Sequence, residues 1–184
     1  MLSEFRRRKI ASGFKDLDVN GDGQVESSDI DLLVRNHGEA YGLEPGSEEY
    51  EELSNRTWAI WDQLQRFDTD GDGAVSLAEY VAGWDAFLEQ REAFMANMDK
   101  LVDSFFAIAD RDDDGLITED ELALHYRAWR HPEAKIHEAF GKLDRQGQGG
   151  ISKADWMATL EEYYYSEDPT VPGNWLPPFD PTQE

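Results

Sequence analysis

Residues 68–79 read Asp68-Thr69-Asp70-Gly71-Asp72-Gly73-Ala74-Val75-Ser76-Leu77-Ala78-Glu79, a segment in which acidic side chains alternate with small ones. With Asp68 counted as place 1, carboxylates occupy places 1, 3, 5 and 12, and glycine occupies place 6. A hard divalent cation such as calcium takes roughly six to eight oxygen ligands, and this spacing supplies them from one short loop. Glycine at place 6 permits the positive φ that bends the chain around an ion. The predicted ligands are the side chains of Asp68, Asp70, Asp72 and Glu79 and the backbone carbonyl of Ala74.

This unit occurs four times without gaps, at residues 18–29, 68–79, 110–121 and 144–155. Every copy begins with Asp, has Gly at place 6 and carries a β-branched residue at place 8. Two apolar residues three positions apart end directly before each copy, and that spacing puts both on one face of a helix. The sequence therefore predicts four helix–loop–helix units of the EF-hand type and an all-α fold.

Two of the other copies keep a metal-binding pattern. The third loop matches in full, with Asp110, Asp112, Asp114, the Leu116 carbonyl and Glu121 as predicted ligands. The first loop offers Asp18, Asn20, Asp22, the Gln24 carbonyl and Asp29, so place 12 is Asp rather than Glu. The shorter side chain falls about 1.5 Å short of the reach of Glu. We expect this loop to bind calcium more weakly or to share it with magnesium, which prefers compact octahedral sites. Glu26 at place 9 is a candidate for partial compensation.

The fourth loop, 144–155, lacks the charge of the other three. It keeps Asp144 and Asp155 but has Gln146 and Gln148 at places 3 and 5. Two carboxylates and two neutral amides offset the dehydration of a divalent ion poorly. We predict a structural partner without a metal site, which covers the apolar face of the third unit. About three calcium ions are therefore expected in all.

Composition excludes several classes of function. Asp and Glu total 40 against 17 Lys and Arg, which gives a net charge of -23 and opposes binding to nucleic acid or anionic membranes. The chain has no cysteine, so disulfides and thiolate metal sites are absent. No secretory signal, membrane-spanning run or catalytic motif is evident, so a cytoplasmic protein without enzymatic activity is expected.

The four-unit layout, which covers residues 1 to about 165, resembles the sarcoplasmic calcium-binding proteins and their bacterial, calerythrin-like relatives. The aromatic and proline-containing segments 163–169 and 172–176 resemble the C-terminus of the bacterial branch. The resemblance implies two paired lobes in a compact body and short strand pairing between loops, Val25 with Val75 and Ile117 with Ile151. It also implies a cytosolic calcium buffer whose sites can hold magnesium at rest.

The expected organisation has three parts. Residues 1–90 form the N-terminal pair of units, residues 91–165 form the C-terminal pair, and residues 166–184 form a tail that packs on the body. Trp175, Leu176 and Phe179 are the tail side chains expected to cover the apolar interior.

Two other roles stay open beside a monomeric buffer that needs no protein partner. A calcium sensor would expose an apolar groove to a partner protein, but sensors line such grooves with methionine and this chain has four Met against nine Phe, seven Tyr and six Trp. A luciferin-type binder would hold a small molecule in an aromatic interior, as in calcium-triggered photoproteins. The degraded fourth loop and the positions of the four histidines, all before residue 138, speak against that role.

Overall fold

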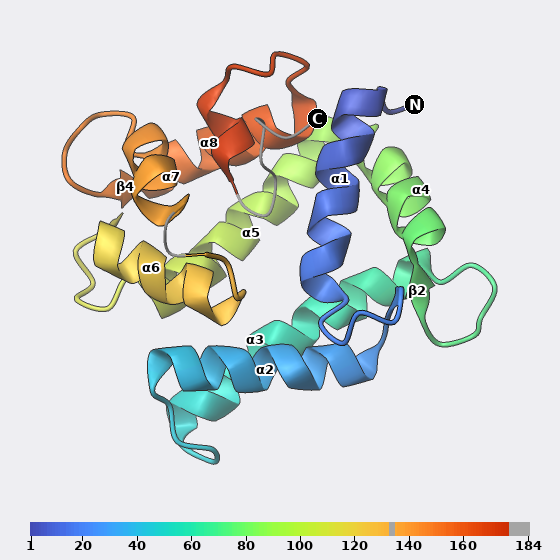
Figure 1. Ribbon diagram of the computed structural model, residues 1–184, viewed down its shortest axis with the longest axis horizontal. Helices are drawn as coiled ribbons and strands as arrows, with labels where there is room; N and C mark the ends of the chain where they lie inside the picture. Colours follow the sequence, from blue (N-terminus) through green and yellow to red (C-terminus); the bar gives the residue numbers. More distant parts are fainter. Residues whose placement is uncertain (133–134, 177–184) are drawn as a thin grey trace. The chain divides into compact units, whose positions relative to one another are not determined.

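Each predicted loop lies between two helices in the computed structural model, which describes residues 1–132 and 135–176 (Figure 1). The chain divides into two units, residues 1–89 and 90–184, and each unit contains two of the loops. The second unit includes the described part of the tail. The structure is mostly helical with short antiparallel strand pairs, which confirms the predicted fold class.

In the first unit, serine side chains cap backbone N–H groups at the start of two helices, residues 4–17 and 48–64. Ser3 Oγ accepts a hydrogen bond from the N–H of Arg6, and Ser47 Oγ accepts one from the N–H of Tyr50, each at 3.2 Å. The elements of this unit are α1 (Glu4–Leu17), β1 (Gln24–Val25), α2 (Ser27–Tyr41), α3 (Glu48–Leu64), the 3₁₀ turn η1 (Gln65–Phe67), β2 (Val75–Ser76) and α4 (Leu77–Leu88).

The second unit follows a break between two helices, and the residues at this break include no Gly or Pro. Helix α4 ends at Leu88 and α5 begins at Arg91. The elements of this unit are α5 (Arg91–Ala109), β3 (Leu116–Ile117), α6 (Glu119–Ala128), α7 (Ile136–Leu143), β4 (Ile151–Ser152), α8 (Lys153–Tyr165) and the 3₁₀ turn η3 (Pro172–Trp175). His131 and Pro132 lie between α6 and α7.

Strand pairing joins the two loops of each unit. Strands β1 and β2 are antiparallel with Val25 opposite Val75, and β3 and β4 are antiparallel with Ile117 opposite Ile151. All four side chains are fully buried. The predicted coupling of loop 1 with loop 2, and of loop 3 with loop 4, is confirmed.

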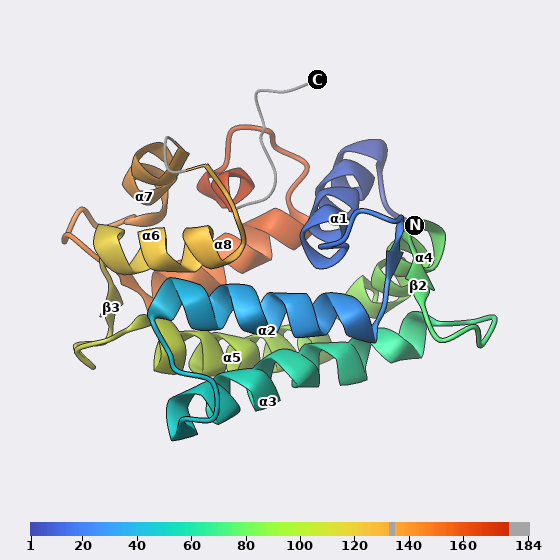
Figure 2. The same ribbon diagram turned by 60° about the horizontal axis from the view of Figure 1, so that its bottom comes forward.

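In the first unit, α2 packs along α3 and α1 packs on α4, as Figure 2 shows for α2 and α3. Aromatic rings fill the junction of α1, η1 and α4. The Tyr80 ring lies 5.5 Å from Phe14, 6.3 Å from Phe67 and 6.0 Å from Trp84, centroid to centroid, all edge-on. Core packing is therefore the role of these rings.

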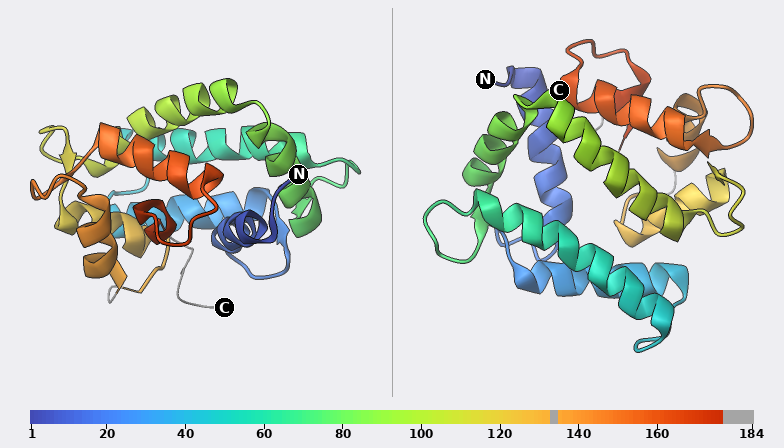
Figure 3. Two further views of the ribbon diagram at one scale, coloured as in Figure 1. Left: turned by 90° about the horizontal axis from the view of Figure 1, so that it is seen from above. Right: turned by 180° about the vertical axis from the view of Figure 1, so that it is seen from behind.

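In the second unit, α5 runs beside α8 (Figure 3). Phe105 of α5 stacks on Trp156 of α8 at 4.4 Å, and Phe94 lies edge-on to Tyr164 at 5.0 Å. The tail turn η3 packs on α7 and α8, and Leu176 is buried. Phe179, also expected to pack, lies outside the described residues. None of the helices in the described part of the chain combines the length and apolar character that crossing a bilayer requires.

Candidate metal centres

All four loops share one backbone bend. The glycine at place 6 has a φ between 84° and 90° in every loop, as predicted, at Gly23, Gly73, Gly115 and Gly149. Its N–H donates a hydrogen bond of 2.9–3.1 Å to the Asp at place 1 of the same loop. Place 4 is also left-handed in each loop, and there Asp113 adopts a φ of 56° where the other loops have glycine. The bend is therefore independent of how many carboxylates a loop carries.

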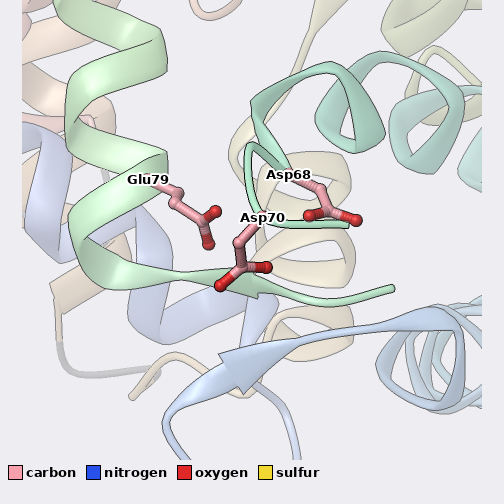
Figure 4. A group of neighbouring side chains, drawn as sticks. All are labelled: Asp68, Asp70 and Glu79. Atoms are coloured by element: carbon pink, nitrogen blue, oxygen red, sulfur yellow. The ribbon is translucent and has the colours of Figure 1, made fainter. Parts of the chain in front are cut away.

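Loops 2 and 3 bring three carboxylates each into one small space. Ligand oxygens of Asp68, Asp70 and Glu79 all lie within 4.8 Å of one another, and Figure 4 shows the Glu79 carboxylate reaching from α4 toward the two loop aspartates. The same holds for a second group, Asp110, Asp112 and Glu121. Among the residues that the structure describes, these are the two groups of this kind. Closely spaced like charges repel, and a divalent cation between them removes that cost.

The Glu at place 12 is held and kept ionised by N–H groups at places 2 and 9. Glu79 accepts hydrogen bonds from Thr69 at 2.9 Å and from Ser76 at 3.0 Å. These bonds, the Ser76 N–H foremost, lower the pKa of Glu79 to about 2. A carboxylate with this orientation and charge is suited to bind a cation with both oxygens.

Glu121 has the equivalent contacts in loop 3. It accepts hydrogen bonds from the N–H groups of Arg111 at 2.7 Å and Thr118 at 2.9 Å. Partial burial raises its pKa, but these hydrogen bonds outweigh burial, so the pKa lies below its ordinary value. By contrast, the charge of Asp114, followed by desolvation, raises the pKa of Asp112. The crowded loop therefore favours a bound cation.

The remaining predicted ligands of loops 2 and 3 lie beside these groups. Asp72 and Asp114, at place 5, accept hydrogen bonds from the N–H groups of Ala74 at 2.9 Å and Leu116 at 2.8 Å, and neither belongs to the three-carboxylate groups. Ala74 directly precedes β2, and Leu116 begins β3. Strand pairing therefore helps to fix the position of both predicted carbonyl ligands.

Loop 1 is bent in the same way, and its carboxylates accept hydrogen bonds from backbone N–H groups of the loop. Its Asp18 accepts hydrogen bonds from three backbone N–H groups, and Asp22 accepts one from Gln24 at 2.9 Å. Asp29 is fully buried and accepts from Asn20 at 3.1 Å and Glu26 at 3.0 Å. The side-chain oxygen of Asn20 itself accepts from Asp22 at 2.8 Å. Within the described residues, the carboxylates of this loop do not form a group as close as those in loops 2 and 3.

Loop 4 fills two of its ligand positions with side-chain donors. The Gln146 amide donates to Asp155 at 3.3 Å, and the Gln148 amide donates to the Gly150 carbonyl at 3.2 Å. These acceptors stand at places 12 and 7, where a bound ion would need them. These two hydrogen bonds use oxygens that a bound ion would need, and the expectation that loop 4 is a structural partner without a metal site stays a prediction.

Sequence reasoning missed the hydroxyl groups that hold place 12. Ser76 Oγ donates to Glu79 at 2.8 Å and Thr118 Oγ1 donates to Glu121 at 2.7 Å, and both hydroxyls also cap the following helix. Both residues stand at place 9, where calcium loops often hold a bridging water. The signal that identifies the cap is Ser or Thr followed three residues later by Glu. The side chain at place 9 therefore positions the Glu at place 12.

Known proteins resemble this chain over most of its length. The EF-hand sequence profile matches residues 10–32, 62–83 and 101–124, which are the first three units. Calerythrin of Saccharopolyspora erythraea is 25% identical over 168 residues, 90% of this chain and 95% of calerythrin.

Two solved structures have the same fold. A calcium-binding protein of Streptomyces coelicolor has a TM-score of 0.71 at 23% identity, over 89% of this chain and 99% of that one. The calcium-loaded apo form of the coelenterazine-binding protein of Renilla muelleri has a TM-score of 0.74 at 21% identity, over 95% and 98%. With four helix–loop–helix units paired two by two, the chain is a calcium-binding protein of the EF-hand superfamily.

Proposed function

We propose that this protein is a calcium buffer that binds three ions, one in each of loops 1, 2 and 3, and that magnesium competes at loop 1. The proposal includes a cytoplasmic monomer with no catalytic role and no required protein partner. A buffer needs charged sites but no surface that calcium uncovers. The observation that favours buffering over sensing is the position of the tail in the second unit.

The tail turn η3 occupies the helix faces that a sensor of this class would have to expose. Its Gly173 N–H donates to Glu162 of α8 at 2.8 Å, and a Cβ built on Gly173 would lie 2.6 Å from the Thr159 carbonyl oxygen. Asn174 is fully buried and its amide donates to the Asp168 carbonyl at 2.9 Å. Such close backbone contact supports a permanent cover over α7 and α8.

The geometry of loop 1 supports competition by magnesium. Asp29 is buried and already spans two backbone N–H groups, so α2 would have to move inward before both of its oxygens could reach one ion. A single oxygen from place 12 gives a six-coordinate site, which suits magnesium better than calcium. Glu26 stands as the N-cap of α2, and a direct ligand role for it stays part of the proposal.

The decisive experiment combines calorimetry with an environment-sensitive dye. Titration of the metal-free protein with calcium should give three bound ions, and dye fluorescence should rise little. The Glu79→Gln and Glu121→Gln variants should each lose one ion, while Asp155→Asn in loop 4 should keep all three. A large calcium-dependent dye signal would point to a sensor instead. Millimolar magnesium should weaken calcium binding at loop 1 alone.

A second candidate function is the carriage of a small molecule, and one buried group favours it. The Tyr126 hydroxyl is buried and finds no hydrogen-bond partner among the described residues, and burial raises its pKa. A ligand could satisfy that hydroxyl. Coelenterazine is a suitable probe, because a structurally similar protein is named for binding it. Saturable quenching of tryptophan fluorescence that Tyr126→Phe weakens would support this role.

A further inference from the structure

Loop 4 differs from the other loops in the atoms that face its ligand positions. In loop 2, places 3 and 5 are Asp70 and Asp72, whose carboxylate oxygens serve as hydrogen-bond acceptors. In loop 4 the same places are Gln146 and Gln148, whose amide groups donate to Asp155 and to the Gly150 carbonyl. The loop therefore satisfies with its own N–H groups the oxygens that would otherwise face an ion.

We propose that the Gln146 and Gln148 amides take the place of a metal ion in loop 4, so that this loop stays closed without calcium and pre-organises loop 3. The inference rests on the proposed function in one respect, because loop 3 must be a calcium site for its affinity to respond. A loop binds its ion more weakly when only a small fraction of the molecules has the binding-competent conformation. If loop 3 already has that conformation before calcium binds, this loss of affinity is avoided.

The β3–β4 pair carries this effect from loop 4 to loop 3. Leu116, whose carbonyl is a predicted ligand, lies opposite Ser152, and Ile117 lies opposite Ile151. Gly150 approaches Leu116 so closely that a Cβ on it would lie 2.7 Å from the Leu116 Cβ. A loop 4 that is held closed therefore fixes the backbone that presents a ligand of loop 3.

Ion pairs around loop 4 also form without a metal. At place 2, Arg145 donates to both carboxylate oxygens of Glu162 in α8, at 2.9 and 2.7 Å. At place 10, Lys153 contacts Asp99 at 3.1 Å and Asp103 at 2.5 Å, both in α5. Both sides of the loop are thus tied to helices by contacts that calcium removal leaves intact.

Loops 1 and 2 lack the glutamine pair of loop 4, since places 3 and 5 are Asn20 and Asp22 in loop 1 and Asp70 and Asp72 in loop 2. Loop 2 gathers three carboxylates within 4.8 Å, and in the absence of a cation their repulsion favours opening. The β1–β2 pair joins loop 2 to loop 1, which carries the carboxylates of Asp18, Asp22 and Asp29. It is therefore expected to loosen when calcium is removed, whereas the β3–β4 pair stays formed.

Residue-resolved hydrogen exchange on the full chain in EDTA tests this difference. In the wild-type protein the amides of Ile117 and Ile151 should exchange at least about tenfold more slowly than those of Val25 and Val75, a difference of about 1.4 kcal/mol in opening free energy. Equal rates in the two strand pairs would overturn the inference. Since no calcium is present, this result does not depend on the proposed function.

Variants of the two glutamines identify the cause. The Gln146→Ala/Gln148→Ala variant should lose the extra protection, and calcium affinity at loop 3 should fall about fivefold, which corresponds to about 1 kcal/mol. Gln90→Ala is the matched control, because Gln90 is an exposed residue of the same unit and makes no side-chain capping bond. Unchanged exchange and unchanged affinity in the double variant would overturn the inference.

An isosteric variant separates hydrogen-bond donation from side-chain volume. Gln146→Glu/Gln148→Glu keeps the size of both side chains but replaces the donors with acceptors, so it too should lose protection in EDTA. Retained protection would overturn the inference. If loop 3 of the wild-type protein bound no calcium, the proposed function would fail there, and the exchange rates in EDTA would still decide whether loop 4 closes itself.

Discussion

At place 12 of each loop, one methylene group separates two hydrogen-bond patterns. Where the residue is Glu, the N–H at place 2 donates to its carboxylate, as from Thr69 to Glu79. Where it is Asp, the side chain is too short, and the N–H at place 2 donates instead to the carbonyl of a Leu two residues earlier. In loop 1 this bond runs from Val19 to Leu17 at 3.0 Å, and in loop 4 from Arg145 to Leu143 at 2.9 Å. Side-chain length therefore sets how far the exiting helix must move to close on an ion.

Asp29→Glu should convert loop 1 into a calcium-selective site. The longer side chain should reach an ion with both oxygens, so calcium affinity at this loop should rise about tenfold, or about 1.4 kcal/mol, and magnesium competition should weaken. Calorimetric calcium titration with and without magnesium measures both. Asp155→Glu is the control, since Gln146 and Gln148 should still keep loop 4 free of metal. Identical magnesium sensitivity in wild type and Asp29→Glu would contradict this account.

Asp113→Gly should stabilise the calcium-loaded protein. Asp113 has a φ of 56°, a conformation that costs a non-glycine residue energy and that glycine adopts in the other three loops. The expected gain is about 0.5–1 kcal/mol, because the greater freedom of glycine in the unfolded chain offsets part of the relief. Thermal melting measures it. Gly71 stands at the same place of loop 2 and has a φ of 77°, so Gly71→Ala should lower the melting temperature.

At the scale of elements, two glycines inside helices have different surroundings. Gly83 in α4 faces the Phe67 ring, and a Cβ there would lie 2.2 Å from Phe67 Cδ1. Gly141 in α7 faces open space, since nothing lies within 4 Å of the position of a Cβ. The same residue type therefore serves packing in one helix and is merely tolerated in the other.

Substitution of these two glycines by alanine should have opposite effects. Gly83→Ala should destabilise the protein by about 1–3 kcal/mol, because the methyl group forces the Phe67 ring or α4 to shift. Gly141→Ala should stabilise it by up to about 1 kcal/mol through helix propensity. Chemical denaturation of the calcium-loaded protein measures both changes. A stabilising Gly83→Ala would contradict the packing of η1 against α4.

Helix α2 contains a buried histidine that should make the first unit sensitive to acid. Burial lowers the pKa of His37, and the hydrogen bond from its Nδ1–H to the Leu33 carbonyl, 2.9 Å, opposes this only in part. Below about pH 6.5 the unfolded chain binds a proton that the folded chain does not, so the free energy of unfolding falls as the pH drops through this range. The slope for one proton is at most about 1.4 kcal/mol per pH unit.

His37→Gln should reduce this dependence, measured by denaturation in EDTA between pH 7 and pH 5. The control is His137→Gln, because His137 is 89% exposed and pairs with Glu119 at the surface. Equal pH slopes in the wild type and His37→Gln would contradict the assignment.

At the scale of the whole molecule, the excess of acidic groups couples folding to metal. The chain carries 40 Asp and Glu against 17 Lys and Arg. Loops 2 and 3 concentrate three carboxylates each within 4.8 Å. A ligand that binds only the folded state stabilises it, by about 2.7 kcal/mol per site at 100 times the dissociation constant.

Chelation should therefore lower the melting temperature sharply. Calorimetric melting in calcium and in EDTA measures the change. Added potassium chloride should raise the EDTA melting temperature more than the calcium one, because salt screens the uncompensated carboxylates. Equal melting temperatures with and without calcium would contradict the link between folding and metal.

Much of the fold and of the candidate sites is predictable because the relevant contacts are local. Each loop is built within twelve residues, so the spacing of Asp, Gly and Glu is enough to predict the bend and the candidate ligands. The pairing of Val25 with Val75 follows from the resemblance of the four-unit layout. The expected boundary between the two pairs of units, after residue 90, lies at the break between α4 and α5, but no local signal marks a helix end there, because Glu89 and Gln90 are residues that also occur inside helices.

The order of amino acids specifies four bends, their oxygen donors and the loss of charge in the last loop, because these properties belong to short segments whatever surrounds them. Packing specifies the rest. Arg145 contacts Glu162, seventeen residues away, and Glu162 holds Gly173, eleven residues further on. These contacts form because α8 and the tail turn meet beside loop 4. Long-range contacts of this kind depend on how the helices pack around a shared core, and a local sequence pattern does not specify that packing.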